Sequence, residues 1–218
     1  MSLRGPDVSG WQPGFEPWQV RCDFIICKAT GGTSYTSPSF RKQADDALAA
    51  GKLLGVYHFA GDGVAGSARE EAEHFLREFE PYIGKAIPIL DWEAEATAWP
   101  VVWAREWLDI VAQRTGSTPW FYSYASYIEH TDCRAIAHYP LWVAAYFAGY
   151  DEMGWQDNPP YYGSYGDWDG AVAYQYTSSG TVGYPGHLDL NIFYGSAGDW
   201  NAMIADDLDP EEIWNYPL

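Results

Sequence analysis

The residue pair with the clearest chemical potential is Asp91 and Glu93, which end the apolar run Ile87-Pro-Ile-Leu-Asp-Trp-Glu. In a strand, alternate side chains share a face, so both carboxylates would point the same way as Ile87 and Ile89. Like charges on one strand face repel each other, and their presence needs a reason. The alternative without a function is that both carboxylates lie at a strand end exposed to solvent. Paired carboxylates at the mouth of a pocket are what cleavage of a glycosidic bond requires, and we favour that interpretation.

Further polar side chains lie at the ends of other predicted strands. They are Asp7, Lys28, Thr30, Tyr57, His58, Tyr122, Tyr146, Gln175, Tyr176, Asp189 and Asn191. Each alone is weak evidence, because an aspartate such as Asp7 is more often a turn or helix cap, and His58 is more often a satisfied strand-end histidine than a ligand. Lys28 is either a counter-ion for the acids or a lysine that extends along apolar surface to solvent. In a barrel of parallel strands these ends form one rim, where four carboxylates would converge.

The elements that must position these residues follow an alternating pattern. Eight short apolar runs are predicted as strands, over residues 5–9, 24–29, 53–59, 87–92, 119–124, 141–146, 171–177 and 188–193. Helices are predicted from Ser37 as N-cap to Gly51, from a capping box at Ser67 to Glu80, around 103–116 and, more weakly, over 126–137. No convincing helix separates the last three strands, and residues 149–170 are predicted as a long loop. Repeated βα units favour a parallel sheet, and eight strands favour a closed α/β barrel.

Composition narrows the class of partner. The 218-residue chain has 30 acids against 12 Lys and Arg, a net charge of −18, which argues against nucleic acid and anionic membranes. Its 12 Trp and 17 Tyr exceed what a core requires, and the surplus suits sugar faces or an interface. Three cysteines do not make a disulfide framework. No apolar leader or membrane-length run is visible, so we expect synthesis in a bacterial cytoplasm, no membrane insertion and a monomer.

Cofactor and metal motifs are weak. Gly61-Asp-Gly63-Val-Ala-Gly66 has the letters of a dinucleotide fingerprint, but it follows the third strand, not the first, and we expect it to form a loop at the pocket mouth. Glu71 and His74 share a helix face, where solvation is the ordinary expectation. No zinc motif is evident. We therefore predict no cofactor and no metal.

Eight motifs in order give a specific resemblance. They are Gly5-Pro-Asp7-Val-Ser9, Lys28-Ala-Thr30-Gly-Gly-Thr33, Gly55-Val-Tyr57-His58-Phe59, Leu90-Asp91-Trp-Glu93, Phe121-Tyr122-Ser123, Leu141-Trp142-Val-Ala-Ala-Tyr146, Tyr174-Gln175-Tyr176 and Leu188-Asp189-Leu-Asn191-Ile-Phe193. In order and approximate spacing the chain resembles the glycoside hydrolase family 25 lysozymes from about residue 5 to 196. The resemblance implies an irregular TIM-like (β/α)5(β)3 barrel. It also implies cleavage of the β-1,4 bond between N-acetylmuramic acid and N-acetylglucosamine in bacterial peptidoglycan.

The resemblance further implies roles for individual residues. Glu93 would be the proton donor and later the base, and Asp91 would stay charged and hold the N-acetyl group, which would itself act as the nucleophile. Asp7 and Asp189 match the other two acids of the family site. The remaining candidates for substrate contact are Tyr57, His58, Tyr122, Tyr146, Gln175, Tyr176, Lys28 and Asn191.

The expected organisation is a catalytic barrel over residues 1–198 and an acidic segment over 199–218 that packs on the barrel or begins a linker. A phage endolysin is the favoured biological setting. Two alternatives stay open, a non-catalytic peptidoglycan-binding barrel and a wall amidase or peptidase. Four acids weigh against the first, and the lack of evident zinc ligands or of a Cys-His pair weighs against the second.

Overall fold

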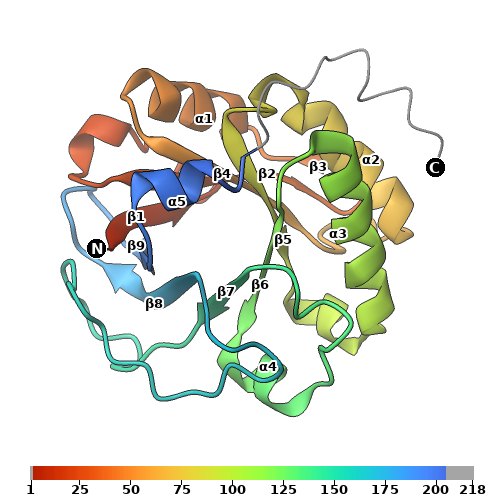
Figure 1. Cartoon of the computed structure of the whole chain (residues 1–218). Helices are drawn as coiled ribbons and strands as arrows, with labels where there is room; N and C mark the ends of the chain where they lie inside the picture. Colours follow the sequence, from red (N-terminus) through yellow and green to blue (C-terminus); the bar gives the residue numbers. More distant parts are fainter. Residues whose placement is uncertain (1, 205–218) are drawn as a thin grey trace.

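Eight strands close into a barrel in this computed structural model, which describes residues 2–204 (Figure 1). The barrel strands are β1 (Leu3–Val8), β2 (Phe24–Gly31), β4 (Leu53–Phe59), β5 (Ala86–Asp91), β6 (Trp120–Tyr124), β7 (Leu141–Ala144), β8 (Ala173–Gly180) and β9 (Leu188–Phe193). The short β3 (Tyr35–Thr36) pairs only with the end of β2. Pairing of β1 with β2 closes the ring. The predicted α/β barrel of eight strands is therefore confirmed.

The barrel is mixed rather than fully parallel. From β1 through β2, β4, β5, β6 and β7 to β8, each strand runs parallel to its neighbour. The last strand, β9, is antiparallel to both β8 and β1. The beginning of β9 therefore lies at the rim where the other seven strands end.

Helices cover only part of the barrel. They are α1 (Phe40–Ala49), α2 (Ala68–Phe79), α3 (Val101–Thr115), α4 (Ala125–His130) and α5 (Ala197–Asn201), with short 3-10 turns at Pro17–Gln19, Glu80–Tyr82 and Ala94–Ala98. The predicted capping box is present, because Ser67 and Glu70 bond each other's backbone N–H groups. Gly116 ends α3 in the left-handed conformation, with φ of 66°.

Two predicted helix boundaries were wrong. The first helix begins at Phe40 after Ser39 as N-cap, and not at Pro38 after Ser37, because a turn at residues 38–39 separates the helix from Ser37, whose N–H donates to the Ala29 carbonyl of β2. The fourth helix ends at His130 and not near residue 137, because Thr131 already has extended backbone.

The 149–170 segment is a long loop, as predicted, and it covers barrel strands that no helix covers. Its only strand-like contact is a single bridge between Met153 and Gly180. Trp168 anchors it, since the indole stacks on Phe121 at 5.7 Å and its N–H donates to the Tyr139 carbonyl at 2.8 Å. The loop therefore packs on the outer wall of the barrel by its own side chains.

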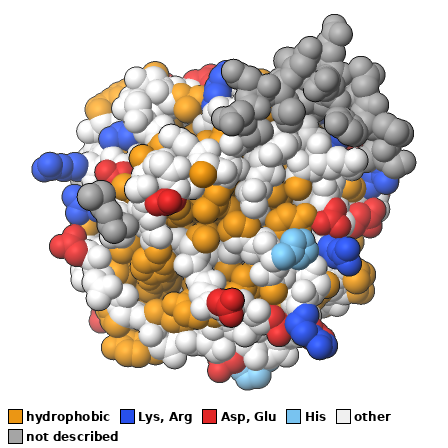
Figure 2. Space-filling view, in the orientation of Figure 1, with side chains coloured by type: hydrophobic (Ala, Val, Ile, Leu, Met, Phe, Trp, Pro, Cys, Tyr) orange, Lys and Arg blue, Asp and Glu red, His pale blue; other side chains and the backbone are white. Residues whose placement is uncertain are grey.

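A second feature fills the end of the barrel opposite the rim. Trp200 of α5 is fully buried and packs at 5.0–5.2 Å against Phe24, Trp120 and Phe193, which point into the barrel. Figure 2 shows this face, on which Lys and Arg side chains lie toward the edge. The predicted boundary after residue 198 falls inside α5, and residues 205–218 of the predicted acidic segment lie outside the described residues.

Candidate active site

All four predicted catalytic acids line one pocket at the rim of the barrel. Asp7, Asp91, Glu93 and Asp189 surround a cavity of about 320 Å³. Six other predicted or neighbouring residues on its wall are Lys28, Tyr57, Tyr122, Tyr146, Gln175 and Trp142. The structure thus brings together carboxylates from distant parts of the sequence, with Asp7 near its beginning and Asp189 near its end.

The direction of β9 explains how Asp189 reaches this pocket. The sequence interpretation treated Asp189 as one more strand end, whereas it is the second residue of β9. Because β9 is antiparallel, its beginning lies at the same rim, and Asp189 pairs in register with Asp7 of β1. Directly paired residues of antiparallel strands have side chains on the same face. The two carboxylates therefore face the same pocket.

The chain after β5 is held in a strained turn that positions Glu93. The Trp92 N–H donates to the Tyr122 carbonyl at 2.9 Å, and the Ser123 hydroxyl donates to the Trp92 carbonyl at 2.7 Å. Glu93 then precedes Ala94, the one described non-glycine residue with positive φ, at 49°. An alanine in the left-handed region costs roughly 1–2 kcal/mol and persists where surrounding structure fixes it. The local bonds to β6 supply that fixation directly before the carboxylate.

Asp7 is the most firmly held of the four acids. Its Oδ2 accepts hydrogen bonds from the Gln175 amide at 2.9 Å and the Asn191 amide at 2.8 Å. The Gln175 oxygen in turn accepts from the Tyr122 hydroxyl at 3.0 Å and from the Tyr146 hydroxyl at 2.8 Å. These bonds fix which way the Gln175 amide faces, so its N–H groups point at Asp7.

The pKa values of all four acids are raised. Burial raises the pKa of Asp7 to about 6, against the lowering effect of the Asn191 and Gln175 bonds. Burial, with charge on Asp7 and Glu93, raises the pKa of Asp189 to about 8. Burial is also the main cause for Glu93, and the charge of Asp7 adds to it. Asp7 is therefore more readily ionised than Asp189, and it helps Glu93 to keep its proton.

Asp91 differs from the expectation that it stays charged. Burial raises the pKa of Asp91 well above its usual value, and the neighbouring Glu93 raises it further. Its Oδ1 atom is buried, and no described protein group donates a hydrogen bond to it. A buried acceptor without a donor is costly, so this oxygen has an acceptor capacity that the described protein leaves unfilled.

Lys28 is the one basic side chain among the residues that line this pocket. Its ammonium donates to Asp62 at 2.7 Å and lies 4.4 Å from the centre of the Phe59 ring. It lowers the pKa of both Asp91 and Glu93 against the larger effect of burial. Of the two interpretations from sequence, the counter-ion is the one that this geometry fits.

Three predicted substrate-contact residues do not line the pocket. His58 and Tyr176 are fully buried on the outer face of the barrel wall, because each directly follows an inward-facing residue, Tyr57 or Gln175, and neighbouring strand residues face opposite ways. Asn191 faces inward but lies below the pocket surface, fully buried, where it holds Asp7. The alternation that identified Asp91 and Glu93 would also have excluded His58 and Tyr176.

The glycine loop after β4 is bound by a protein carboxylate. Glu71 of α2 is fully buried, contrary to expectation, and accepts from the Gly61 and Gly66 N–H groups at 2.9 Å each. It also bonds His58 Nε2 at 2.8 Å, while Thr30 bonds the Nδ1 of the same ring. The N–H groups that a phosphate would need are thus already used. The loop carries Asp62 to Lys28 at the pocket.

Sequence analysis missed two aromatic residues beside the acids. Trp11 is 90% exposed and lines the pocket of the acids as well as a neighbouring cavity. On the other side, Tyr124 lines a cavity of about 380 Å³ that shares Glu93, Tyr122 and Tyr146 with the first. Glu93 therefore lies between two adjoining cavities. The signal available in the sequence was the position of Trp11, two residues after the strand-end motif Asp7-Val-Ser9.

The described residues also bear on metal and membrane sites. Within residues 2–204, no group of three or more His, Cys, Asp or Glu side chains is arranged to hold a metal ion. Over the same residues, no helix is both long and apolar enough to span a bilayer. All three cysteines are free and buried.

The raised pKa of Asp189 predicts a pH-dependent cost in stability. A carboxyl that binds its proton more tightly when folded stabilises the fold fully below about pH 4, and this contribution is lost as pH rises toward 8. Asp189→Asn cannot ionise, so we expect its Tm to exceed that of the wild type at pH 8 by a few degrees, on the order of 1–2 kcal/mol for a partly solvated group, and to converge with it at pH 4. Thermal denaturation across this pH range tests it. Exposed Asp151→Asn is the control, and a wild-type–variant gap independent of pH would contradict the expectation.

The sequence is similar to known proteins, among them a glycoside hydrolase family and two relatives. The family model for glycosyl hydrolases family 25 matches residues 6–184. The chain is 31% identical over 144 residues to an N,O-diacetylmuramidase of Chalaropsis sp, covering 58% of this chain and 68% of that protein. It is 28% identical over 208 residues to the uncharacterized protein YegX of Escherichia coli O6:H1, covering 88% and 70% of the two chains.

Solved structures agree in fold. The bacterial lysozyme from Streptomyces coelicolor superposes with a TM-score of 0.75 at 26% identity, covering 92% of this chain and 96% of that one. The catalytic domain of an endolysin from bacteriophage P40 of Listeria monocytogenes has the same fold, with a TM-score of 0.75 at 21% identity over 93% and 97% of the chains. Because the family model spans most of the sequence, this protein belongs to glycosyl hydrolases family 25 and is a glycoside hydrolase.

Proposed function

We propose that this glycoside hydrolase is a lysozyme-type endo-N-acetylmuramidase in which Glu93 is the acid and base. The proposed substrate is the β-1,4 bond between N-acetylmuramic acid and N-acetylglucosamine in bacterial peptidoglycan. The observation that carries the assignment is the position of Glu93, partly exposed between two adjoining cavities and with a raised pKa. A glycosidic oxygen that joins a sugar in each cavity would lie beside this carboxyl.

Glu93 has the electrostatics of a general acid. Burial and the charge of Asp7 raise its pKa and so favour the protonated form, which is the form that donates a proton to the leaving oxygen. After the bond breaks, the carboxylate accepts a proton from the attacking water. The same nearby charge of Asp7 favours regaining that proton, which resets the site.

Asp91 supplies the acceptor that an N-acetyl group requires. The Asp91 carboxyl lines the pocket and its Oδ1 has no donor from the described protein, so a substrate amide N–H at this carboxyl would supply a hydrogen bond that the protein does not. A hydrogen bond to the carboxylate form favours ionisation, so bound substrate would lower the raised pKa of Asp91. An ionised Asp91 would then strengthen proton retention on Glu93 and orient the acetyl oxygen toward the anomeric carbon. This predicts retention of configuration without an enzyme-linked sugar.

The remaining pocket residues have supporting roles in this proposal. Asp7 is the fixed negative charge beside the oxocarbenium-like transition state, and Asp189 faces it across the β1–β9 pair. Tyr57, Tyr122 and Tyr146 form the sugar-facing wall together with Gln175. Tyr57 and Tyr122 keep their phenolic protons, since burial raises the pKa of each. We further propose that the enzyme acts as a monomer in a phage endolysin setting, without nucleic acid or membrane insertion as part of its action.

The Glu93→Gln variant tests the central assignment. Glutamine keeps the shape but cannot donate the proton, so we expect a loss of about 10²–10⁴-fold in cleavage with the fold retained. Reducing ends released from purified peptidoglycan measure it, and Glu95→Gln, an exposed acid two residues along, is the matched control. New amino groups would instead indicate an amidase or peptidase, and binding without either product a non-catalytic module. Near wild-type release by Glu93→Gln would remove the assignment.

The Asp91→Asn variant tests the acetyl contact. We expect a loss of 10²-fold or more in kcat with binding of wall fragments retained, because asparagine cannot provide the negative charge. On glycan whose N-acetyl groups have been removed, wild type and Asp91→Asn should be nearly equal, since both lack the same interaction. If the two losses were simply additive, Asp91 would have a role unrelated to the acetyl group.

Trp11 is proposed as a stacking surface for a sugar ring at the edge of the pocket. Trp11→Ala should raise KM about tenfold, about 1.4 kcal/mol, with little change in kcat, because the ring contacts substrate away from the reacting atoms. Trp18→Ala is the matched control, as Trp18 is 67% exposed and lines neither cavity. Steady-state kinetics on soluble glycan fragments measure both, and an equal change in the two variants would contradict the proposal.

A further inference from the structure

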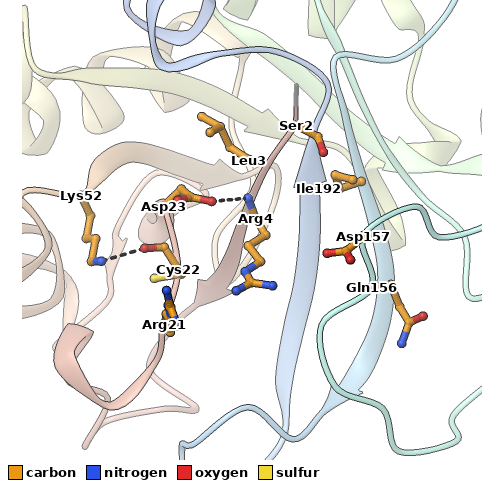
Figure 3. Close-up of a pocket in the computed structure, with 10 residues that line it drawn as sticks. All are labelled: Ser2, Leu3, Arg4, Arg21, Cys22, Asp23, Lys52, Gln156, Asp157 and Ile192. Atoms are coloured by element: carbon orange, nitrogen blue, oxygen red, sulfur yellow. Dashed lines mark hydrogen bonds between the residues drawn. The ribbon is translucent and has the colours of Figure 1, made fainter.

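The outer wall of the barrel carries a second cavity, away from the acids. No described helix covers β9 and β1, so segments of loop border an open cleft of about 430 Å³ there (Figure 3). Its lining includes Arg4 of β1 and Ile192 of β9, together with Cys22, Lys52 and Asp157 from the neighbouring loops. Arg4 faces outward, whereas Asp7, three residues along the same strand, faces the catalytic pocket.

This cleft concentrates positive charge in a strongly acidic protein. Three of the 12 Lys and Arg residues line it, namely Arg4, Arg21 and Lys52, although the net charge of the chain is −18. Among the described residues, none of these three takes part in an ion pair within 4.0 Å. The ion-paired cations are instead Lys28, Arg41, Lys42, Arg105 and Arg134. The three basic side chains of the cleft are thus not neutralised by an ion pair with a described acidic side chain.

Two acids also line the cleft, and one is already engaged. Asp23 accepts the backbone N–H of Arg4 at 3.0 Å, which ties its carboxylate to the strand (Figure 3). Asp157 is exposed at the edge of the cleft. The lining therefore has one net positive charge, with the cations free to contact a ligand.

Two of the three cations are held in place by the protein. The Arg4 guanidinium lies 5.4 Å from the centre of the Trp155 ring, and the Lys52 ammonium donates to the Cys22 carbonyl at 2.7 Å. That single bond leaves two N–H donors on Lys52, and stacking leaves the edge of the Arg4 fork available. Side chains ordered in advance lose less entropy when they bind.

We propose that this cleft is a binding site for a phosphate group. Two guanidinium groups that offer paired donors and one ammonium that acts as a point charge are the combination that suits a phosphate oxyanion. The cavity is larger than a phosphate ion, so a phosphate ester, free or within a phosphodiester polymer, would fit. The site is independent of the proposed muramidase reaction, since none of its residues lines the catalytic pocket.

Binding of inorganic phosphate to the full chain in 150 mM sodium chloride tests the proposal. We expect saturable binding by calorimetry, with a perturbed Trp155 indole N–H signal in NMR that Trp155→Phe assigns. The double variant Arg4→Gln/Arg21→Gln should weaken binding about tenfold or more and leave peptidoglycan cleavage unchanged. Arg69→Gln/Arg77→Gln removes the same charge from α2 and should bind like the wild type.

A second titration, with poly(glycerol phosphate), distinguishes the sources of the phosphate. Tighter binding of the polymer than of the ion, lost in Arg4→Gln/Arg21→Gln, would support a polymeric phosphodiester ligand, and equal binding per phosphate would support a small phosphate ester. No saturable binding of either probe above sodium chloride, or equal weakening in both double variants, would overturn the proposal. The Trp155 signal tests it in the wild type even if a variant fails to fold.

Discussion

Four carboxyl groups share one small, poorly solvated pocket, and the cost of charging them together governs the chemistry of this protein. Each acid is disfavoured as an anion by burial, and each charge that does form raises the pKa of its neighbours. Lys28 supplies the one positive charge on the pocket wall and is shared with Asp62. The pocket therefore holds fewer negative charges than carboxyl groups near neutral pH. Hydrogen bonds from the protein determine which carboxyl is ionised.

Side chains of the barrel wall beneath the pocket determine which carboxyl is ionised. Two amide N–H donors point at Asp7, and the Gln175 amide is oriented by two tyrosine hydroxyls. Trp142 donates to the Asn191 oxygen at 2.9 Å and so orients the second amide in the same way. Within residues 2–204, Asp189 and Glu93 receive no comparable set of donors, so nothing of this kind offsets the burial that raises the pKa of each. The neutral amides of Gln175 and Asn191 thus favour the ionised form of Asp7 over that of the other three carboxyls.

The strand pattern made most of this arrangement predictable, within definite limits. Alternation placed Asp91 and Glu93 together, and the motifs around Asp7 and Asp189 suggested their partners. The direction of β9 could not be predicted from its own residues, because an inward-facing Asp189 has the same alternation in either direction. His58 was predicted at the pocket although strand alternation excludes it, because its neighbour Tyr57 faces the pocket. The burial of Glu71 depends on the fold of the glycine loop, which only tertiary contacts determine.

The absence of helices over β8, β9 and β1 in the described chain has consequences on both faces of the wall. Inside, these strands carry Asp7, Gln175 and Asp189, whose mutual distances depend on direct strand pairing rather than on helix packing. Outside, the same strands are covered by the 149–170 loop, which leaves the cleft at Arg4 open. Inward-facing and outward-facing residues alternate along β1. A shift of one residue in its register would therefore turn Asp7 out of the pocket and Arg4 into the barrel. The pairing of Asp7 with Asp189 and of Arg4 with Ile192 in one ladder therefore fixes the acidic pocket inside the barrel and the position of Arg4 in the outer cleft together.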